Sequence, residues 1–164
     1  MIVKIVPGDL LEAQELFIAQ QCNCCTTRAH GLSDQIFSKF PYADVYAQRP
    51  SRSMANRAIT PSKPGTVSVH VKKGYPTILN LMGQYGPGKP HYSKRFYSSD
   101  KYKDDATARL GYFSCCLREL ESIVGDQEVA IPFSIGCGLA GGDWTKYETL
   151  LREAKTRFVM YQKE

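Results

Sequence analysis

Hydrophobic positions along this chain switch repeatedly between strand-like and helix-like spacing. Short runs that are apolar throughout or that alternate with polar residues predict strands at residues 2–6, 16–22, 66–71, 77–82, 129–133 and 157–161. Apolar residues at steps of three and four predict helices at residues 31–40, 106–124 and 144–154. Strands that alternate with helices, several of them apolar throughout, favour an α/β fold in which a mainly parallel or mixed sheet is covered on both faces.

Two stretches lack periodicity, at residues 47–65 and 83–103. Loops this long in a compact domain usually carry function or disorder. The strands at 66–71 and 77–82 are expected to be neighbours, joined by a turn at 72–76. No repeat, low-complexity segment or linker divides the chain, so residues 1–164 are expected to form a single domain.

Composition adds few constraints. The 164 residues carry a net charge of +5, which favours an anionic ligand without singling out nucleic acid. No apolar run reaches the length of a membrane span, and the first residues are too strand-like for a signal peptide. The protein is therefore expected to be intracellular, in the cytoplasm or the nucleus, with no membrane partner.

The six cysteines do not have the spacing of a metal site. Cys22 and Cys25 have the C-x-x-C spacing, but no second such pair occurs, and none of the three histidines stands at zinc-finger spacing. We expect reduced thiols, no bound metal and no cofactor.

The most informative segment is residues 130–144, AIPFSIGCGLAGGDW. A strand-length apolar run leads into a turn that contains Gly136, Gly138, Gly141 and Gly142, and Asp143 then stands at the start of a helical pattern. Glycines let backbone N–H groups approach an anion closely, and a helix start adds its dipole. The segment predicts a phosphate-binding turn.

Other predicted strands also end in polar or glycine-containing segments. Asp9 follows the first strand, where it either caps a helix or accepts hydrogen bonds from a ligand amine. The second strand leads into residues 22–31, CNCCTTRAHG, before the next helix. The helix starts near Gly31 and Asp143 are thus positioned to clamp a diphosphate together. Neither the dinucleotide-binding fingerprint nor a P-loop is present.

These segments resemble the macrodomain family of ADP-ribose-binding modules. The resemblance rests on residues 8–10 (GDL), on Cys22-Asn23 with residues 30–32 (HGL), and on residues 135–139 (IGCGL) with Asp143-Trp144. The branch that looks most similar includes the terminal ADP-ribose protein glycohydrolase, the yeast ADP-ribose 1''-phosphate phosphatase and phage proteins. The resemblance implies a three-layer α/β/α fold with a mainly parallel, mixed six-stranded central sheet.

The resemblance also implies a set of ligand contacts. Asp9 would hold the adenine amine, Leu10 the adenine ring, and Asn23 the distal ribose. Two loops would surround the phosphates and the distal ribose, and their residues are Ala29, Gly31 and Leu32 in the first and Ser134, Ile135, Gly136, Cys137, Gly138 and Leu139 in the second.

Three positions depart from the family pattern. Ala29 stands where the first loop usually has a glycine. The glycohydrolase works through a lysine and an aspartate, and the matching positions here are Gln84 and Ala140. A covalent lysine mechanism is therefore not expected.

Candidate catalytic residues are His30, Asn23 and Asp143. His30 is expected beside the distal ribose, as a general acid or as a solvent-facing loop residue. Asp143 would orient water or cap the last helix, and the cap is favoured. Cys137 is an alternative nucleophile, although packing is the favoured role for its small side chain.

Four functions follow from these expectations. The leading one is hydrolysis of ADP-ribose 1''-phosphate to ADP-ribose and phosphate. The alternatives are a mono-ADP-ribosyl hydrolase acting on modified protein or nucleic acid, and a non-catalytic ADP-ribose reader. Residues 89–103, with five Lys or Arg among aromatic residues, also permit single-stranded nucleic-acid binding, but a solvated loop is favoured over it. His91 in this segment would reach a ligand only if the loop closes over the site.

Overall fold

A six-stranded sheet forms the centre of the computed structural model, which describes residues 1–51, 55–90 and 97–163. His91 and the basic residues 94 and 95 lie outside the described residues. The strands are β1 (Ile2–Pro7), β2 (Phe17–Asn23), β3 (Val67–His70), β4 (Thr77–Gln84), β5 (Glu128–Pro132) and β6 (Arg157–Gln162). The helices are α1 (Leu32–Lys39), α3 (Ala106–Val124) and α4 (Trp144–Glu153), with short 3-10 turns η1 (Leu10–Glu12) and η2 (Pro41–Ala43).

The strand order is β1-β6-β5-β2-β4-β3. β3 runs antiparallel to β4, and all the other neighbours are parallel. The expected mixed, mainly parallel sheet is confirmed, and so is the pairing of the two strands on either side of the turn at 72–76.

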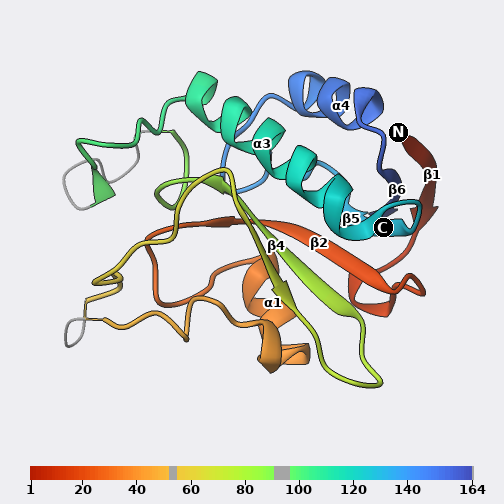
Figure 1. Cartoon of the computed structure of the whole chain (residues 1–164), viewed down its shortest axis with the longest axis horizontal. Coiled ribbons are helices and arrows are strands. Elements are labelled where there is room, and N and C mark those ends of the chain that lie inside the picture. The colour runs from red at the N-terminus through yellow and green to blue at the C-terminus, as the bar shows by residue number, and fades with distance from the viewer. Residues whose placement is uncertain (52–54, 91–96, 164) are drawn as a thin grey trace.

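The sheet is covered on both faces (Figure 1), with α3 and α4 on one side and α1 on the other. Neighbouring residues of one strand therefore enter different cores. Ala19 packs in the core that contains residues of α3 and α4, whereas Ile18 packs in the core that contains residues of α1. This double burial explains why several strands are apolar throughout, and it confirms the three-layer α/β/α arrangement.

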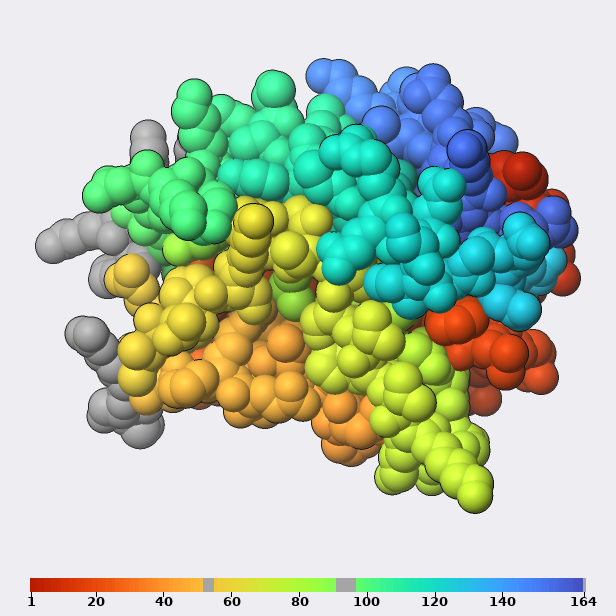
Figure 2. Space-filling model, viewed as in Figure 1, coloured from red at the N-terminus to blue at the C-terminus, as the bar shows by residue number. Residues whose placement is uncertain are grey.

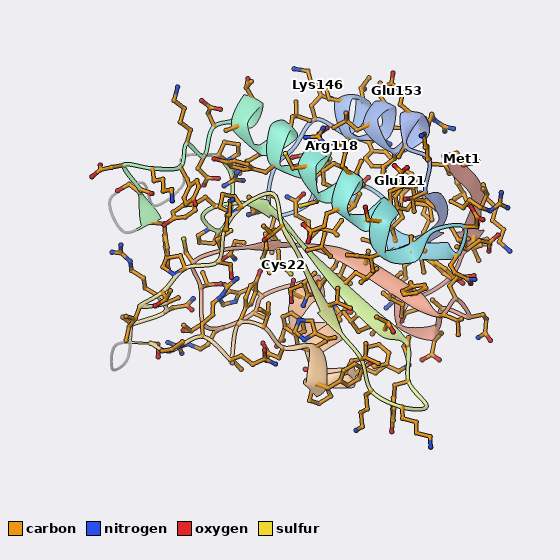
Figure 3. The ribbon with its side chains drawn as sticks, in the orientation of Figure 1. Met1, Cys22, Arg118, Glu121, Lys146 and Glu153 are labelled. Atoms are coloured by element: carbon orange, nitrogen blue, oxygen red, sulfur yellow. The ribbon has the colours of Figure 1, made fainter. Side chains whose placement is uncertain are left out.

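The two helices on the first face are amphipathic. α3 buries Phe113, Leu117 and Leu120, and α4 buries Tyr147 and Leu151. Lys146 and Glu153, labelled in Figure 3, lie on the exposed side of α4. None of the helices within the described ranges has the length and hydrophobicity that a bilayer crossing needs.

The segment that precedes β3 lies against α3, as the yellow surface beside the green and cyan helix in Figure 2 shows. Gly65 makes this close approach possible, because a Cβ atom there would lie 3.1 Å from the Cβ of Cys115. Its φ of 82° also favours glycine. An isolated bridge between Ser51 and Ala58 gives the otherwise irregular segment 47–65 some order.

The sheet divides at the carboxyl ends of its central strands. β2 pairs with β5 only at Phe17–Val129 and Ile18–Ala130, whereas its pairing with β4 continues to Asn23–Gln84. The ends of β2 and β5 therefore separate and leave a crevice, the place where open α/β sheets bind ligands.

β4 continues two residues beyond the predicted boundary at residue 82. Gly83 and Gln84 are thus strand residues and not the start of a loop. Gly83 leaves room for the side chain of Gln21 on the neighbouring strand, because a Cβ atom there would lie 2.5 Å from Oε1 of Gln21. Such a contact between neighbouring strands leaves no periodic signal in the sequence.

Candidate functional site

A cavity of about 880 Å³ occupies the crevice between the ends of β2 and β5. Its lining comes from residues within 20–33, 84–89 and 132–140, joined by Tyr46, Asn56 and Tyr97. The volume lies in the range of roughly 300–1,000 Å³ that is usual for small-molecule sites.

Asn23, at the end of β2, shapes the first loop. Its Oδ1 accepts hydrogen bonds from the backbone N–H groups of Cys25 and Thr26, both at 2.9 Å, and from the Thr26 hydroxyl at 3.1 Å. Its Nδ2 donates to the hydroxyl of Tyr46 at 3.2 Å. The side-chain oxygen is therefore engaged within the protein, and the second Nδ2 proton is what Asn23 can offer to a ligand in the cavity.

The N-terminus of α1 differs from those of the other described helices. The carboxylates of Asp105 and Asp143 cap α3 and α4, but Gly31 at the N-cap of α1 supplies no side-chain hydrogen bond. Leu32 and Ser33 of the first turn line the cavity. Because the first N–H groups of a helix have no partner within it, this turn can present donors to an anion.

The four glycines of the turn after β5 have different surroundings. A Cβ atom on Gly136 or Gly142 would lie 2.7 Å from ring carbons of Tyr147, so these two glycines are required for packing. Gly141, at φ 70°, is crowded by the side chain of Lys89. Gly138 lines the cavity and faces open space. The predicted turn is thus partly a packing feature and partly a cavity wall.

Backbone strain is also present at this turn. Ser134 has a φ of 58°, a left-handed conformation that no other non-glycine residue adopts in the described part of the chain. Residues held in such conformations are frequent at ligand sites. Ser134 lines the cavity.

The two predicted loops meet at Gly31 and Leu139. A Cβ atom on Gly31 would lie 2.9 Å from Cδ1 of Leu139. Leu139 itself is 69% exposed although it is a large apolar residue. Its side chain adds an exposed apolar surface to the cavity lining.

Arg109 on α3 fixes the wall formed by residues 86–89. Its guanidinium donates to both carboxylate oxygens of Asp104, at 2.9 and 2.8 Å, and also to the carbonyls of Gly88 at 2.6 Å and Ala140 at 3.2 Å. Asp104 in turn accepts hydrogen bonds from the backbone N–H groups of Tyr85 and Gly86, where this wall begins. The sequence signal for Arg109 is its place four residues before buried Phe113, on the inward side of a helix.

The charged side chains that line the cavity are basic. They are Arg28 and Lys89, with His30 beside them, and no Asp or Glu lines it among the described residues. Such a lining favours an anionic ligand. The same part of the chain holds no group of three His, Cys, Asp or Glu residues that could bind a metal ion.

Eight of the predicted site residues line this cavity: Asn23, His30, Leu32, Ser134, Ile135, Gly136, Gly138 and Leu139. Ala29, Gly31 and Cys137 are next to lining residues but do not line it themselves. Asp9, Leu10 and Asp143 also lie outside the lining.

The carboxylates outside the lining have local partners. Asp143 accepts a hydrogen bond from the backbone N–H of Thr145 at 3.1 Å, the cap that its position favoured. Asp9 accepts from the N–H of Leu11 at 2.9 Å and lies 3.5 Å from Nζ of Lys163. The backbone N–H of Leu11, followed by the charge of Lys163, lowers the pKa of Asp9.

The cysteines are free thiols in this structure. Burial, followed by the nearby charge of Asp143, raises the pKa of Cys137 to about 11. Its Sγ donates to the carbonyl of Ile135 at 3.5 Å. A thiol that stays protonated at neutral pH is a poor nucleophile, which supports the packing role.

Several cavity residues were not among the predicted site residues, including Arg28, Lys89 and Phe133 as well as Tyr46, Asn56 and Tyr97. Tyr46 holds Asn23, and Asn56 accepts hydrogen bonds from the backbone N–H groups of Thr27 and Arg28 at 2.9 Å. Tyr97 donates to the carbonyl of Asn56 at 2.9 Å. For Asn56 and Tyr97, the only signal was the length of the loops that contain them.

Neither a protein-family model nor a curated protein matches this chain. Solved structures do. A protein of unknown function from Bacteroides thetaiotaomicron matches with a TM-score of 0.65 and 21% identity, covering 98% of both chains. The DarG macrodomain of Mycobacterium tuberculosis matches with a TM-score of 0.63 and 20% identity over 96% of both chains. That of Thermus aquaticus matches with a TM-score of 0.61 and 17% identity over 98% of this chain and 97% of the other. This chain has the macrodomain fold.

Proposed function

We propose that the protein binds ADP-ribose in this cavity and hydrolyses ADP-ribose 1''-phosphate to ADP-ribose and inorganic phosphate. The observation that carries the proposal is the charge of the cavity: Arg28 and Lys89 line it, without a carboxylate among the described lining residues. The first turn of α1 and the turn at 134–139 add backbone donors from two sides. A ligand with several phosphates suits this arrangement.

The ligand is proposed to lie with its diphosphate between these two loops. Asn23 would then offer its remaining amide proton to the distal ribose. At the other end Phe133, which lines the cavity and packs on Trp144 with ring centroids 5.3 Å apart, presents a flat apolar surface to the base. The contacts of Asp9 and Leu10 with adenine stay predictions, because neither residue lines the described cavity.

The proposed reaction requires a proton donor for the departing sugar oxygen. Water attacks the phosphorus, the bond between phosphorus and the 1''-oxygen breaks, and protonated His30 delivers a proton to that oxygen. The proton lost by the water leaves with the phosphate or passes to solvent, and neutral His30 takes up a proton from solvent to return to its starting state. Arg28 and Lys89 would stabilise the charge that develops on the phosphate.

A lysine nucleophile is absent from this proposal for a structural reason. Gln84 stands at the position expected for the catalytic lysine, and its Oε1 accepts from Nε2 of Gln21 at 2.7 Å. Its own Nε2 donates to the carbonyl of Gly86 at 2.9 Å. An amide held in this way has no free amine to attack a sugar.

The first prediction concerns His30. His30→Gln should reduce phosphate release from ADP-ribose 1''-phosphate by about 10²-fold or more, the usual contribution of a general acid, while ADP-ribose affinity changes little. Phosphate release and calorimetric titration with ADP-ribose would measure the two effects. His70→Gln on β3 is the matched control, because His70 contacts Ser68 and lies outside the cavity lining. ADP-ribose binding without phosphate release by the natural protein would rule out the phosphatase.

A non-catalytic reader is the second candidate. It is supported by the capping role of Asp143 and by the lack of a carboxylate in the described lining, which leaves water without a general base. A reader would bind ADP-ribose equally well with and without His30 and would release nothing from any substrate. Loss of label from a mono-ADP-ribosylated protein or nucleic acid would instead indicate a hydrolase that acts on macromolecules.

A further inference from the structure

Among the residues that the structure describes, two arginines are buried, and only one of them has a carboxylate partner. Arg109 is 2% exposed and forms a two-bond pair with Asp104. Arg49 is 8% exposed, and no Asp or Glu within the described ranges lies in salt-bridge distance of it. Their environments therefore differ in net charge.

The partners of Arg49 are all neutral. Its terminal nitrogens donate to the carbonyls of Thr26 at 2.8 Å and Asn23 at 2.7 Å, and to the hydroxyl of Ser62 at 3.0 Å. Its buried Nε has no hydrogen-bond partner among the described residues. Charged side chains are rarely buried without an opposite charge, so this unbalanced cation requires an explanation.

Arg49 lies directly behind one end of the cavity. The two residues whose carbonyls it holds, Asn23 and Thr26, line that end. So does Tyr46, whose ring centroid lies 4.8 Å from the Arg49 guanidinium carbon. The positive charge is thus separated from the cavity by a single layer of residues, in an interior where water screens it weakly.

We infer that Arg49 determines the specificity of this end of the cavity, because its unbalanced charge favours a doubly charged phosphate monoester over a neutral hydroxyl. The inference rests on the proposed function, which places the distal ribose and its 1''-substituent here. ADP-ribose and its 1''-phosphate share the diphosphate and differ only in the group at C1'', a hydroxyl in one and a phosphate in the other. The positive charge of Arg49 can therefore change their relative affinity only through its interaction with that group. Its role is electrostatic and acts through the wall of the cavity.

The test neutralises Arg49 without removing it. Ser62→Asp places a carboxylate beside the guanidinium, as Asp104 stands beside Arg109, and Ser62→Asn is the neutral control of the same size. Calorimetry would compare ADP-ribose with an analogue that carries a non-hydrolysable methylenephosphonate at C1''. We expect the natural protein and Ser62→Asn to bind the phosphonate about 10-fold more tightly than ADP-ribose, and Ser62→Asp to lose that preference.

Arg49→Lys and Arg49→Met provide an independent check. The lysine keeps the charge and should keep a preference for the phosphonate, whereas the methionine should lose it; melting temperature and ADP-ribose affinity show whether each variant is folded. A preference that survives in Ser62→Asp, or a natural protein that binds both ligands equally, would overturn the inference and leave ADP-ribose binding intact. Failure of the natural protein to bind either ligand would overturn the proposed function and the inference together.

Discussion

Single residues in the turn after β5 show why one residue type can serve several purposes. Gly136 and Gly142 allow the backbone to lie on the ring of Tyr147, whereas Gly138 faces the open cavity. The sequence predicted that this turn needs glycine, but it could not separate the two reasons. The partner of Gly136 and Gly142 is Tyr147, a residue that a helical pattern assigns only to a buried face.

This difference between the glycines leads to a prediction. Gly138→Ala should leave the free energy of unfolding within about 0.5 kcal/mol of the natural value, since its Cβ meets open space. Its ADP-ribose affinity should nevertheless fall, because the new methyl group projects where backbone and ligand approach each other. Urea unfolding and calorimetry measure the two quantities.

Gly136→Ala is the companion variant. Its free energy of unfolding should fall by about 1–3 kcal/mol, since Gly136 has a φ of 77° and a Cβ atom there would lie 2.7 Å from the ring of Tyr147. If Gly138→Ala bound ADP-ribose as well as the natural protein does, Gly138 would be excluded from the ligand contact.

At the scale of elements, the starts of the helices differ in whether a side chain caps them and whether they face the cavity. Asp105 and Asp143 satisfy the first N–H groups of α3 and α4, whereas Gly31 leaves those of α1 without a side-chain cap beside the cavity. The sequence predicted all three helices and the cap at Asp143. Which helix start faces the crevice depends on where β2 and β5 separate, and that separation has no signature in the hydrophobic pattern.

The next prediction separates the two roles considered for Asp143. Asp143→Ala should destabilise the protein by about 1 kcal/mol, because the cap of α4 is lost. Phosphate release should stay at the natural level, since Asp143 lies outside the cavity lining. Asp143→Asn keeps a capping side chain but removes the charge, so it should restore stability. A large loss of turnover in both variants, at unchanged ADP-ribose affinity, would instead make Asp143 a water-orienting residue.

For the whole molecule, the sequence was most informative where regular elements repeat. Apolar strands alternating with amphipathic helices predicted the three layers, and two segments of the cavity wall were located by their glycines. Other parts of the wall come from Tyr46, Asn56 and Tyr97 in irregular segments. Arg109 does not line the cavity but holds two of its lining residues, which lie far from it in the chain. Contacts of this kind follow from tertiary packing, so no local pattern could reveal them.

The last prediction concerns how these distant segments are held together. Arg109 holds the carbonyls of Gly88 and Ala140, which belong to two different loops that line the cavity, and Asp104 balances its charge. Asp104→Asn should therefore cost about 3–5 kcal/mol of stability, because it leaves a buried guanidinium without its counter-charge. The folded fraction of this variant should also bind ADP-ribose more weakly, since Arg109 holds both of the cavity segments that contain Gly88 and Ala140.

The matched control for this prediction is Glu148→Gln, which removes an exposed pair with Arg152 on α4 at 3.4 Å. Solvent screens that pair, so its loss should change stability by at most about 0.5 kcal/mol. Urea unfolding of the two variants distinguishes the possibilities. Equal and small losses would mean that the carbonyl hydrogen bonds of Arg109 fix the cavity wall by themselves. A large loss confined to Asp104→Asn would mean that the wall depends on the balance of charge inside the protein, which is the same balance that Arg49 lacks.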